Sequence, residues 1–421
     1  MDKALPVTTY REVFAVPAFR VLFVSRSLAI GGDTLRIVAL SMLVFSITGS
    51  TLLSAITFGI GFMPQVVGGM LLGSLADRIP PRPLIVAGYA SSCVVATLLA
   101  VVEMPVFASL GLVALVAAFT PIFSGASSRL VSEVLTGDLY VLGRSLSTMA
   151  AGAAQIAGMA FGGLAVAAVG PRRALLISAA CELIAALIVR FKLADFPRPR
   201  GERERSAVRQ SWVTNVALLR DRVVRRLLLI QWLPPAFVVG AEALVVAYAA
   251  QRGFPSGAAG IMLAAAPAGM LIGDLVVGRF VRPRVRERLV APLIAVLGLP
   301  LLALALNPPM LVCAALLSVS ASGFAYMLGL QQAFLDAVPE ASRGQAFGLL
   351  GMGLMTWQGL GPVLFGGIGH YSIRLALVIA GACAVAAGAV WGLAYGGGYG
   401  HVEGRTTDRA QPALDAGGVV T

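Results

Sequence analysis

The sequence predicts an all-α membrane protein with twelve transmembrane helices in two halves of six. Its 421 residues are 58% hydrophobic and only 12% charged, with a mean hydropathy of +0.87. A soluble domain carries about a quarter charged residues, so a water-soluble core could not hide this much apolar surface. About twelve apolar runs are long enough to cross a bilayer as helices, and the loops between them alternate in positive charge.

The apolar runs divide the chain at regular intervals. The links expected outside are very short, such as 49–50, 103–104 and 170–171, whereas those expected inside are longer and basic. The expected spans are 19–47, 51–76, 84–102, 105–128, 142–169, 173–193, 227–250, 257–280, 289–306, 309–336, 344–369 and 373–395.

The positive residues behind the net charge of +12 are concentrated in the loops expected on one side of the membrane. With the N-terminus placed inside, 26 of the 32 lysines and arginines fall in inner loops and four in outer loops, which is a strong positive-inside bias. We therefore expect no nucleic-acid partner, a lipid bilayer as the surroundings, and both termini in the cytoplasm. Arginine outnumbers lysine 30 to 2, which favours a multi-pass protein of a bacterial inner (cytoplasmic) membrane.

A charged, proline-bearing break separates two halves that resemble each other. The expected domains are residues 1–193 and 227–395, a cytoplasmic linker at 194–226 in which residues 212–226 form an amphipathic surface helix, and a disordered cytoplasmic tail at 396–421. Phe161-Gly162-Gly163 recurs as Phe365-Gly366-Gly367, and Pro64 pairs with Pro267. Internal repeats of this kind place a substrate site between the halves, near mid-membrane.

The segment after the second span carries the most specific motif. It reads Gly73-Ser74-Leu75-Ala76-Asp77-Arg78, followed by Arg82. This resembles the G-x-L-A-D-R-x-G-R-[RK] signature of the major facilitator superfamily, although Pro80 and Pro81 replace the usual Gly and Arg. The resemblance implies the major facilitator fold and a cytoplasmic gate formed by Gly73, Asp77, Arg78 and Arg82, with Gly278 and Arg279 at the matching place in the second half. A pair of charges that only sets topology is the alternative.

Span 5 resembles the glycine-rich motif of the antiporters in that superfamily. Gly158, Gly162 and Gly163 match, whereas Ala154 and Met159 stand where Gly and Pro are usual. Glycines at this spacing, with Gly366 and Gly367 in the second half, serve helix packing equally well.

The run GGDTLRIVAL in span 1 is similar to the twelve-span drug, macrolide and siderophore efflux branch. The resemblance implies a monomeric secondary transporter, in which protons drive export of a small organic compound such as a drug, an antibiotic or a siderophore-like metabolite. Uptake or facilitated diffusion of a metabolite is the alternative within transport. A non-transporting membrane sensor or lipid-handling protein is the alternative of another class.

Charged residues inside the apolar spans are the candidates for proton coupling. Asp33 and Arg36 lie one turn apart near the middle of span 1, and Glu182 and Glu242 are lone carboxylates in spans 6 and 7. Such groups are costly in a bilayer and mark functional paths. A permanent Asp33–Arg36 structural pair is the alternative, as is a hydrogen-bonded structural role for each glutamate.

Amide and aromatic side chains at membrane depth are the candidates for the substrate cavity. They suit a large amphipathic compound, although core packing explains most aromatics; they are Gln155, Gln231, Trp232, Gln331, Trp357 and Gln358. No nucleotide-binding loop, catalytic constellation or metal-ligand cluster can be assembled, so we expect no enzyme, no cofactor and no metal.

Overall fold

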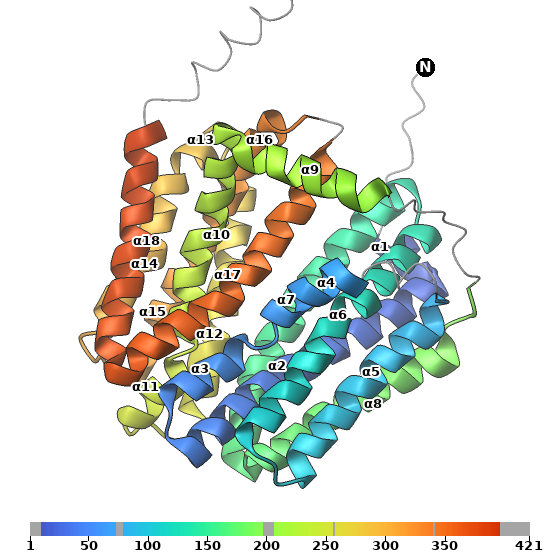
Figure 1. Cartoon of the computed structure of the whole chain (residues 1–421), viewed down its shortest axis with the longest axis horizontal. Coiled ribbons are helices and arrows are strands. Elements are labelled where there is room, and N and C mark those ends of the chain that lie inside the picture. The colour runs from blue at the N-terminus through green and yellow to red at the C-terminus, as the bar shows by residue number, and fades with distance from the viewer. Residues whose placement is uncertain (1–9, 73–78, 197–205, 256, 340–341, 396–421) are drawn as a thin grey trace, which may run out of the picture.

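The computed structural model describes residues 10–72, 79–196, 206–255, 257–339 and 342–395, and every regular element in these ranges is a helix (Figure 1). In chain order they are α1 (Tyr10–Ala15), α2 (Pro17–Thr48), α3 (Thr51–Gly59), α4 (Met63–Leu72), α5 (Pro81–Val101), α6 (Val106–Val134), α7 (Gly137–Val169), α8 (Pro171–Lys192), α9 (Ser206–Arg220), α10 (Arg222–Glu242), α11 (Val245–Gln251), α12 (Ala258–Phe280), α13 (Pro283–Arg288), α14 (Val290–Leu304), α15 (Met310–Ser322), α16 (Tyr326–Ala337), α17 (Arg343–Tyr371) and α18 (Ile373–Tyr395). The all-α prediction is confirmed for these residues.

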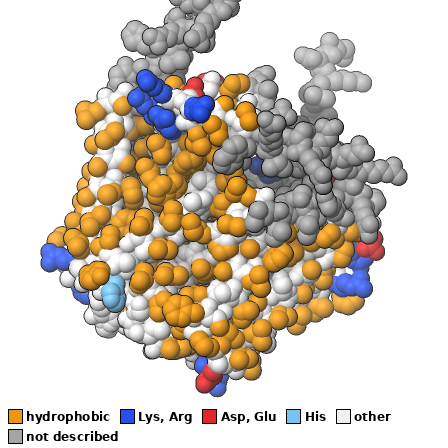
Figure 2. All heavy atoms as spheres, in the orientation of Figure 1, with side chains coloured by type: hydrophobic (Ala, Val, Ile, Leu, Met, Phe, Trp, Pro, Cys, Tyr) orange, Lys and Arg blue, Asp and Glu red, His pale blue; other side chains and the backbone are white. Residues whose placement is uncertain are grey.

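The surface is that of a membrane protein. Within the described ranges, ten helices or paired helices are long and apolar enough to span a bilayer. Hydrophobic side chains cover most of the face seen in Figure 2, with charged side chains toward its edges; Leu393 and Phe191, for example, are 90% and 77% exposed. The ten do not include α17 or the 15-residue α14, so the count of twelve spans stays a prediction.

The short connections are built from glycine and proline. Gly49 ends α2 at φ 62°, and its N–H donates to the Phe45 carbonyl. Gly170, at φ 83°, separates α7 from Pro171, the first residue of α8. Glycine tolerates positive φ, and proline is pre-set for the first turn of a helix. Both turns force consecutive helices to run back beside each other.

Three of the spans are interrupted helices. α3 and α4 are separated at residues 60–62, just before Pro64, and α10 and α11 at residues 243–244, after Pro234 and Pro235. A one-turn 3₁₀ helix, Gly323–Ala325, separates α15 from α16. Proline lacks the N–H that a continuous helix requires, which accounts for the break before Pro64, whereas α10 continues past its two prolines and the α15–α16 break contains none. Breaks at membrane depth are typical of substrate sites in transporters.

The helices before α9 pack mainly with one another, as do those after it, and two seams join the two sets. α2 packs on α7 and α8, and α5 on α6 and α8, whereas α10 packs on α17 and α14 on α18. The seams are α7 with α12 and α3 with α17. At the first, Gly163 and Gly260 are in backbone contact, and at the second a Cβ on Gly59 would come 2.9 Å from Pro362.

The linker helix differs in extent from the expected one. α9 already begins at Ser206 and ends at Arg220, and it crosses one end of the molecule near α10 and α17 (Figure 1). The Asp221 carboxylate accepts from the N–H groups of Val223 and Val224 at 2.8 and 2.9 Å. This N-cap starts α10 at Arg222, five residues before the expected span. Residues 197–205 and the expected disordered tail at 396–421 lie outside the described ranges.

Candidate functional site: a buried charge cluster between α2, α5 and α8

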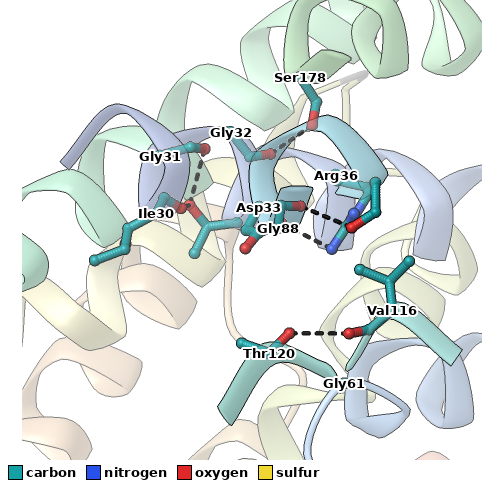
Figure 3. A network of polar contacts seen from close by, with 12 residues as sticks. Ile30, Gly31, Gly32, Asp33, Arg36, Gly61, Gly88, Val116, Thr120 and Ser178 are labelled. Atoms are coloured by element: carbon teal, nitrogen blue, oxygen red, sulfur yellow. Dashed lines mark hydrogen bonds and ion pairs between the residues drawn. The ribbon is translucent and has the colours of Figure 1, made fainter. Parts of the chain in front are cut away.

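Asp33 and Arg36 form an ion pair in the middle of α2. Arg36 Nη2 lies 2.7 Å from Asp33 Oδ1, and the two side chains point toward one another in Figure 3. The Asp33 side chain is 40% exposed and that of Arg36 only 11%. Asp33 is therefore the more accessible member of the pair.

A glycine brings α8 against α2 beside this pair. A Cβ on Gly32 would come 3.0 Å from the Cys181 Cβ, which is tighter than ordinary side-chain contact. The Ser178 hydroxyl donates to the Gly32 carbonyl across the same contact at 2.8 Å (Figure 3). The close approach at Gly32 and the Ser178 hydrogen bond therefore hold α8 against α2 at the level of Asp33.

This contact buries Glu182 next to the ion pair. Glu182 is 1% exposed, and it faces Asp33 and Arg36 from α8. Neither of its carboxyl oxygens accepts a hydrogen bond from an N–H or hydroxyl group of the described residues, and Arg36 Nη1 is likewise buried and unbonded. The Glu182 carboxyl does lie within hydrogen-bonding reach of the Asp33 carboxyl. An ionised carboxylate that is buried without a partner is strongly unfavourable. The cluster therefore holds two carboxyl groups and one guanidinium. The Arg36 Nη1 donor and the acceptor oxygens of Glu182 are not used in hydrogen bonds with each other.

Tyr89 of α5 and Arg26 of α2 extend the cluster. Arg26 stands seven residues before Asp33, a spacing that puts both on one face of the helix, whereas Tyr89 was not recognised from the sequence. The Tyr89 hydroxyl interacts with Ser25 and lies among Glu182, Arg26 and Asp33. The signal in the sequence was a phenol within an otherwise apolar span. Only the packing of α5 on α8 in the structure shows that this phenol lies near Glu182.

Arg26 leads from the cluster toward one end of the bundle. Its Nη1 lies 3.4 Å from the Ser128 hydroxyl of α6. It also borders a pocket of about 20 Å³ together with Ser27, Ser127 and Ser147, which is room for about one water.

Glu242 lies apart from these groups in the later part of the chain. It is the last residue of α10, where that span breaks before α11. Its neighbours Ala241 and Leu244 line an apolar pocket with Tyr248 and Met262. The structure thus brings Glu182 to Asp33 and Arg36, and places Glu242 in a different setting.

The expected gate is described only in part, because Gly73, Asp77 and Arg78 lie outside the described residues. Arg82 begins α5 and forms an ion pair with Asp195 at 2.7 Å, and it also donates to the Arg190 carbonyl at the end of α8.

In the second half, Arg286 Nη2 donates to the Gly278 carbonyl at 2.6 Å and ties α13 to the end of α12. Arg279, the other residue expected at that gate, is exposed.

The span 5 glycines lie on two faces of α7. Gly158 and Gly162 pack against Gly31 and Leu35 of α2, and Gly163 packs against Gly260 of α12. In α17, a Cβ on Gly366 would come 2.6 Å from the Ala55 Cβ, whereas one on Gly367 would meet nothing within 4 Å.

The expected cavity residues divide by exposure. Gln155 and Gln331 are exposed, and Trp357 and Gln358 are half-buried. Gln231 is buried and donates to the Leu227 carbonyl of its own helix at 2.9 Å.

Trp232 is 9% exposed, and its Nε1 donates to the Leu350 carbonyl of α17 at 3.0 Å. Gln231 and Trp232 therefore pack inside the later half of the chain rather than on an open surface.

In the ranges that the structure covers, no group of three or more His, Cys, Asp and Glu side chains could hold a metal ion.

Comparison with known proteins agrees with this architecture. The model of the Major Facilitator Superfamily matches residues 22–340. No curated protein sequence matches significantly.

Three solved transporter structures illustrate the similarity in fold. The nucleoside transporter NupG is 16% identical, with a TM-score of 0.68 over 90% of this chain and 100% of that one. A bacterial homologue of the human lysosomal transporter Spinster, described as inward-facing and unoccupied, is 15% identical, with a TM-score of 0.68 over 96% and 100%. A POT family transporter in complex with a thioalcohol-conjugated peptide is 12% identical, with a TM-score of 0.68 over 88% and 94%.

Proposed function

The chain belongs to the major facilitator superfamily, a family of membrane transporters and not of enzymes, and from that premise we propose that it exports a small organic compound in exchange for protons. The observation that carries the proposal is Glu182, a carboxyl buried at membrane depth within hydrogen-bonding reach of the Asp33 carboxyl and near Arg36, whose oxygens have no N–H or hydroxyl partner among the described residues. A purely structural role would satisfy the carboxyl oxygens, since unsatisfied buried groups are expensive. A group that must gain and lose a proton in each cycle accounts for the missing partner.

The direction of transport rests on the two resemblances in the first half. Span 1 is similar to the drug, macrolide and siderophore efflux branch, and the Gly158–Gly163 stretch is similar to the antiporter motif. The packing of Gly163 on Gly260 supports a role for that stretch at the seam between α7 and α12. Uptake of a metabolite is the second candidate, because the fold that this chain shares with NupG and the POT transporters does not itself fix the direction of transport.

The mechanism that we propose is alternating access between two six-helix halves, residues 1–193 and 227–395. In the assigned topology both termini and α9 face the cytoplasm of a bacterial cell, and Gly49 and Gly170 face outward. The contacts at Gly59 and Gly163 then close the outer end, so Asp33 opens toward the inside. Asp77, Arg78 and Arg82 would latch the inner end when the halves rock.

The cavity between the halves would be lined by the open polar groups. Gln155 and Gln331 are exposed, and Trp357 and Gln358 are half-buried, so they can contact a solute. Trp232 instead connects α10 to α17 through its hydrogen bond. Glu242 is the second candidate for the carboxyl that couples protons to transport. We propose that the chain works as a monomer in the bilayer, with the solute and protons as its partners.

The test is transport by the purified chain in proteoliposomes with an acidic lumen and the membrane potential clamped at zero. The probes are a cation (tetraphenylphosphonium), a neutral compound (chloramphenicol) and an anion (fluorescein). At least one should accumulate in the lumen and leave when nigericin collapses the pH gradient. Accumulation that ignores the pH gradient, or none for all three, would overturn proton-coupled export.

Two variants localise the coupling. Asp33→Asn and Glu182→Gln keep side-chain size but cannot release a proton, so each should abolish gradient-driven accumulation. Exchange of labelled for unlabelled solute at equal pH should still be measurable in Glu182→Gln when the solute concentration is high enough to fill a weakened site, since exchange needs only the rocking motion. If both variants still accumulate the probe as the unmodified chain does, coupling lies elsewhere, and Glu242→Gln is the next variant to measure.

A further inference from the structure

Arg36 has two carboxyl neighbours and is bonded to one of them. Its Nη2 is 2.7 Å from Asp33 Oδ1, while its Nη1 is buried without a hydrogen-bond partner among the described residues. The Glu182 carboxyl lies close to both Asp33 and Arg36, and neither of its oxygens accepts a hydrogen bond from an N–H or hydroxyl group of the described residues. A guanidinium carries five N–H donors in a fixed planar fork, so Arg36 can bind Glu182 with donors that are free in this state.

The two carboxyl groups differ in access. The Asp33 side chain is 40% exposed, whereas Glu182 is 1% exposed. Glu182 is therefore too enclosed to contact an organic solute, and only a proton or Arg36 can neutralise it. Asp33 can meet a solute, but only when Arg36 leaves it.

The surroundings supply no second positive charge at Glu182. From α2 it faces Asp33 and Arg36, from α5 it faces Tyr89, and its neighbour on α8 is Cys181. Arg26 of α2 lies near Tyr89 and bonds Ser128 instead. α7, which also packs on α8, carries no charged residue from Ser145 to Val169. Deprotonated Glu182 therefore has Arg36 as its neutralising neighbour.

We propose that Arg36 passes from Asp33 to Glu182 when Glu182 loses its proton, and that the freed Asp33 then binds the cationic group of an organic cation. This rests on the proposed function and adds the class of solute. The Glu182 O–H releases its proton to solvent, the carboxylate accepts N–H bonds from Arg36, and the Asp33 carboxylate pairs with the solute. In reverse, a proton arriving at Glu182 returns Arg36 to Asp33 and expels the cation. Proton and cation thus exclude each other, as antiport requires.

The experiment measures binding of tetraphenylphosphonium to detergent-purified protein between pH 5.5 and pH 9, with proton release followed at the same time. This probe has a permanent charge, so any pH dependence belongs to the protein. Binding should be at least about tenfold tighter at the high end of the range. Because linkage is reciprocal, it should release one proton for each cation bound at the low end.

Three variants give a pattern that a merely structural cluster would not produce. Asp33→Asn should lose binding at every pH. Glu182→Gln imitates the protonated state, so it should bind weakly, without pH dependence or proton release. Arg36→Gln frees Asp33 permanently, so it should bind at least as tightly as the unmodified chain at high pH and lose the pH dependence.

Exposed Glu103, which forms an ion pair with Arg172 at 3.0 Å, provides the matched control. Glu103→Gln should behave like the unmodified chain in every assay. Size-exclusion profiles and thermal unfolding establish that each variant is folded. If Arg36→Gln does not fold, the contrast between Asp33→Asn and Glu182→Gln still decides the question.

The proposal is overturned if Glu182→Gln retains pH-dependent binding, or if Asp33→Asn binds the cation normally. It is also overturned if chloramphenicol or fluorescein binds with proton release and tetraphenylphosphonium does not. In that case the proteoliposomes would still show accumulation driven by the pH gradient, so the proposed function would stand without the cationic solute. Loss of all gradient-driven transport would instead remove the proposed function itself.

Discussion

Gly163 of α7 and Gly260 of α12 touch backbone to backbone, so a Cβ on either glycine would overlap the Cα of the other. Neither helix has a side chain that could give way at this point. The distance between the two helices is therefore set by the absence of a single methyl group on each. Close approach through small residues is the usual way in which membrane helices associate.

Gly163→Ala should force the two helices apart and weaken closure at this end of the bundle. The expected cost of overpacking is about 1–3 kcal/mol. Spin labels at Thr48 and Tyr371, both exposed near the same end, should report a shift of their distance distribution to longer values. Gly367→Ala is the control, since its Cβ would meet nothing within 4 Å. Equal distributions in the two variants would show that the glycine contact does not control closure.

Glu182→Met should make the protein more stable while removing coupled transport. The side chains are similar in size, and methionine has no oxygens to leave unsatisfied in the buried site. Replacing a poorly satisfied buried polar group with an apolar one is neutral or stabilising, here by up to about 3 kcal/mol. Thermal unfolding in detergent measures the change, and exposed Glu103→Met should remain within about 0.5 kcal/mol. A clear loss of stability in Glu182→Met would indicate a structural carboxyl.

Trp232→Phe should lower stability by about 1 kcal/mol and leave solute affinity unchanged. The variant loses the hydrogen bond from Nε1 to the Leu350 carbonyl, and a typical hydrogen bond contributes about that amount. Thermal unfolding and binding of a transported probe separate the two effects. Tyr371→Phe, at an 89% exposed position, should change neither quantity. Weaker probe binding at unchanged stability would return Trp232 to the cavity lining.

The sequence predicted best what depends on a single helix. Asp33 and Arg36 are three positions apart, and residues at that spacing on a helix are neighbours; the structure pairs them at 2.7 Å. The helical class followed from composition, because in lipid the backbone must satisfy its own hydrogen bonds.

Contacts between helices were beyond reach of the sequence. Glu182 was recognised as a lone carboxylate, but its approach to Arg36 depends on how α8 packs against Gly32, which no local pattern encodes. Tyr89 was missed for the same reason. Trp232 was expected to line the cavity, but it donates to the Leu350 carbonyl instead. The sequence around an aromatic residue at membrane depth does not distinguish a side chain that contacts a solute from one that bonds a neighbouring helix.

The last prediction concerns the orientation of the chain. The 26-to-4 count of positive charges in the loops places the termini inside, which would put the α14–α15 connection outside and the end of α9 inside. Leu306 is 76% exposed and Arg220 is exposed, so a cysteine at either place is accessible from its own side. Cys93, Cys181, Cys313 and Cys383 are first replaced by alanine. A membrane-impermeant maleimide added to intact cells should then label Leu306→Cys and leave Arg220→Cys unlabelled until the cells are broken. The reverse pattern would invert the topology, and Asp33 would then open to the outside, so the same proton and solute sites would have to serve uptake instead of export.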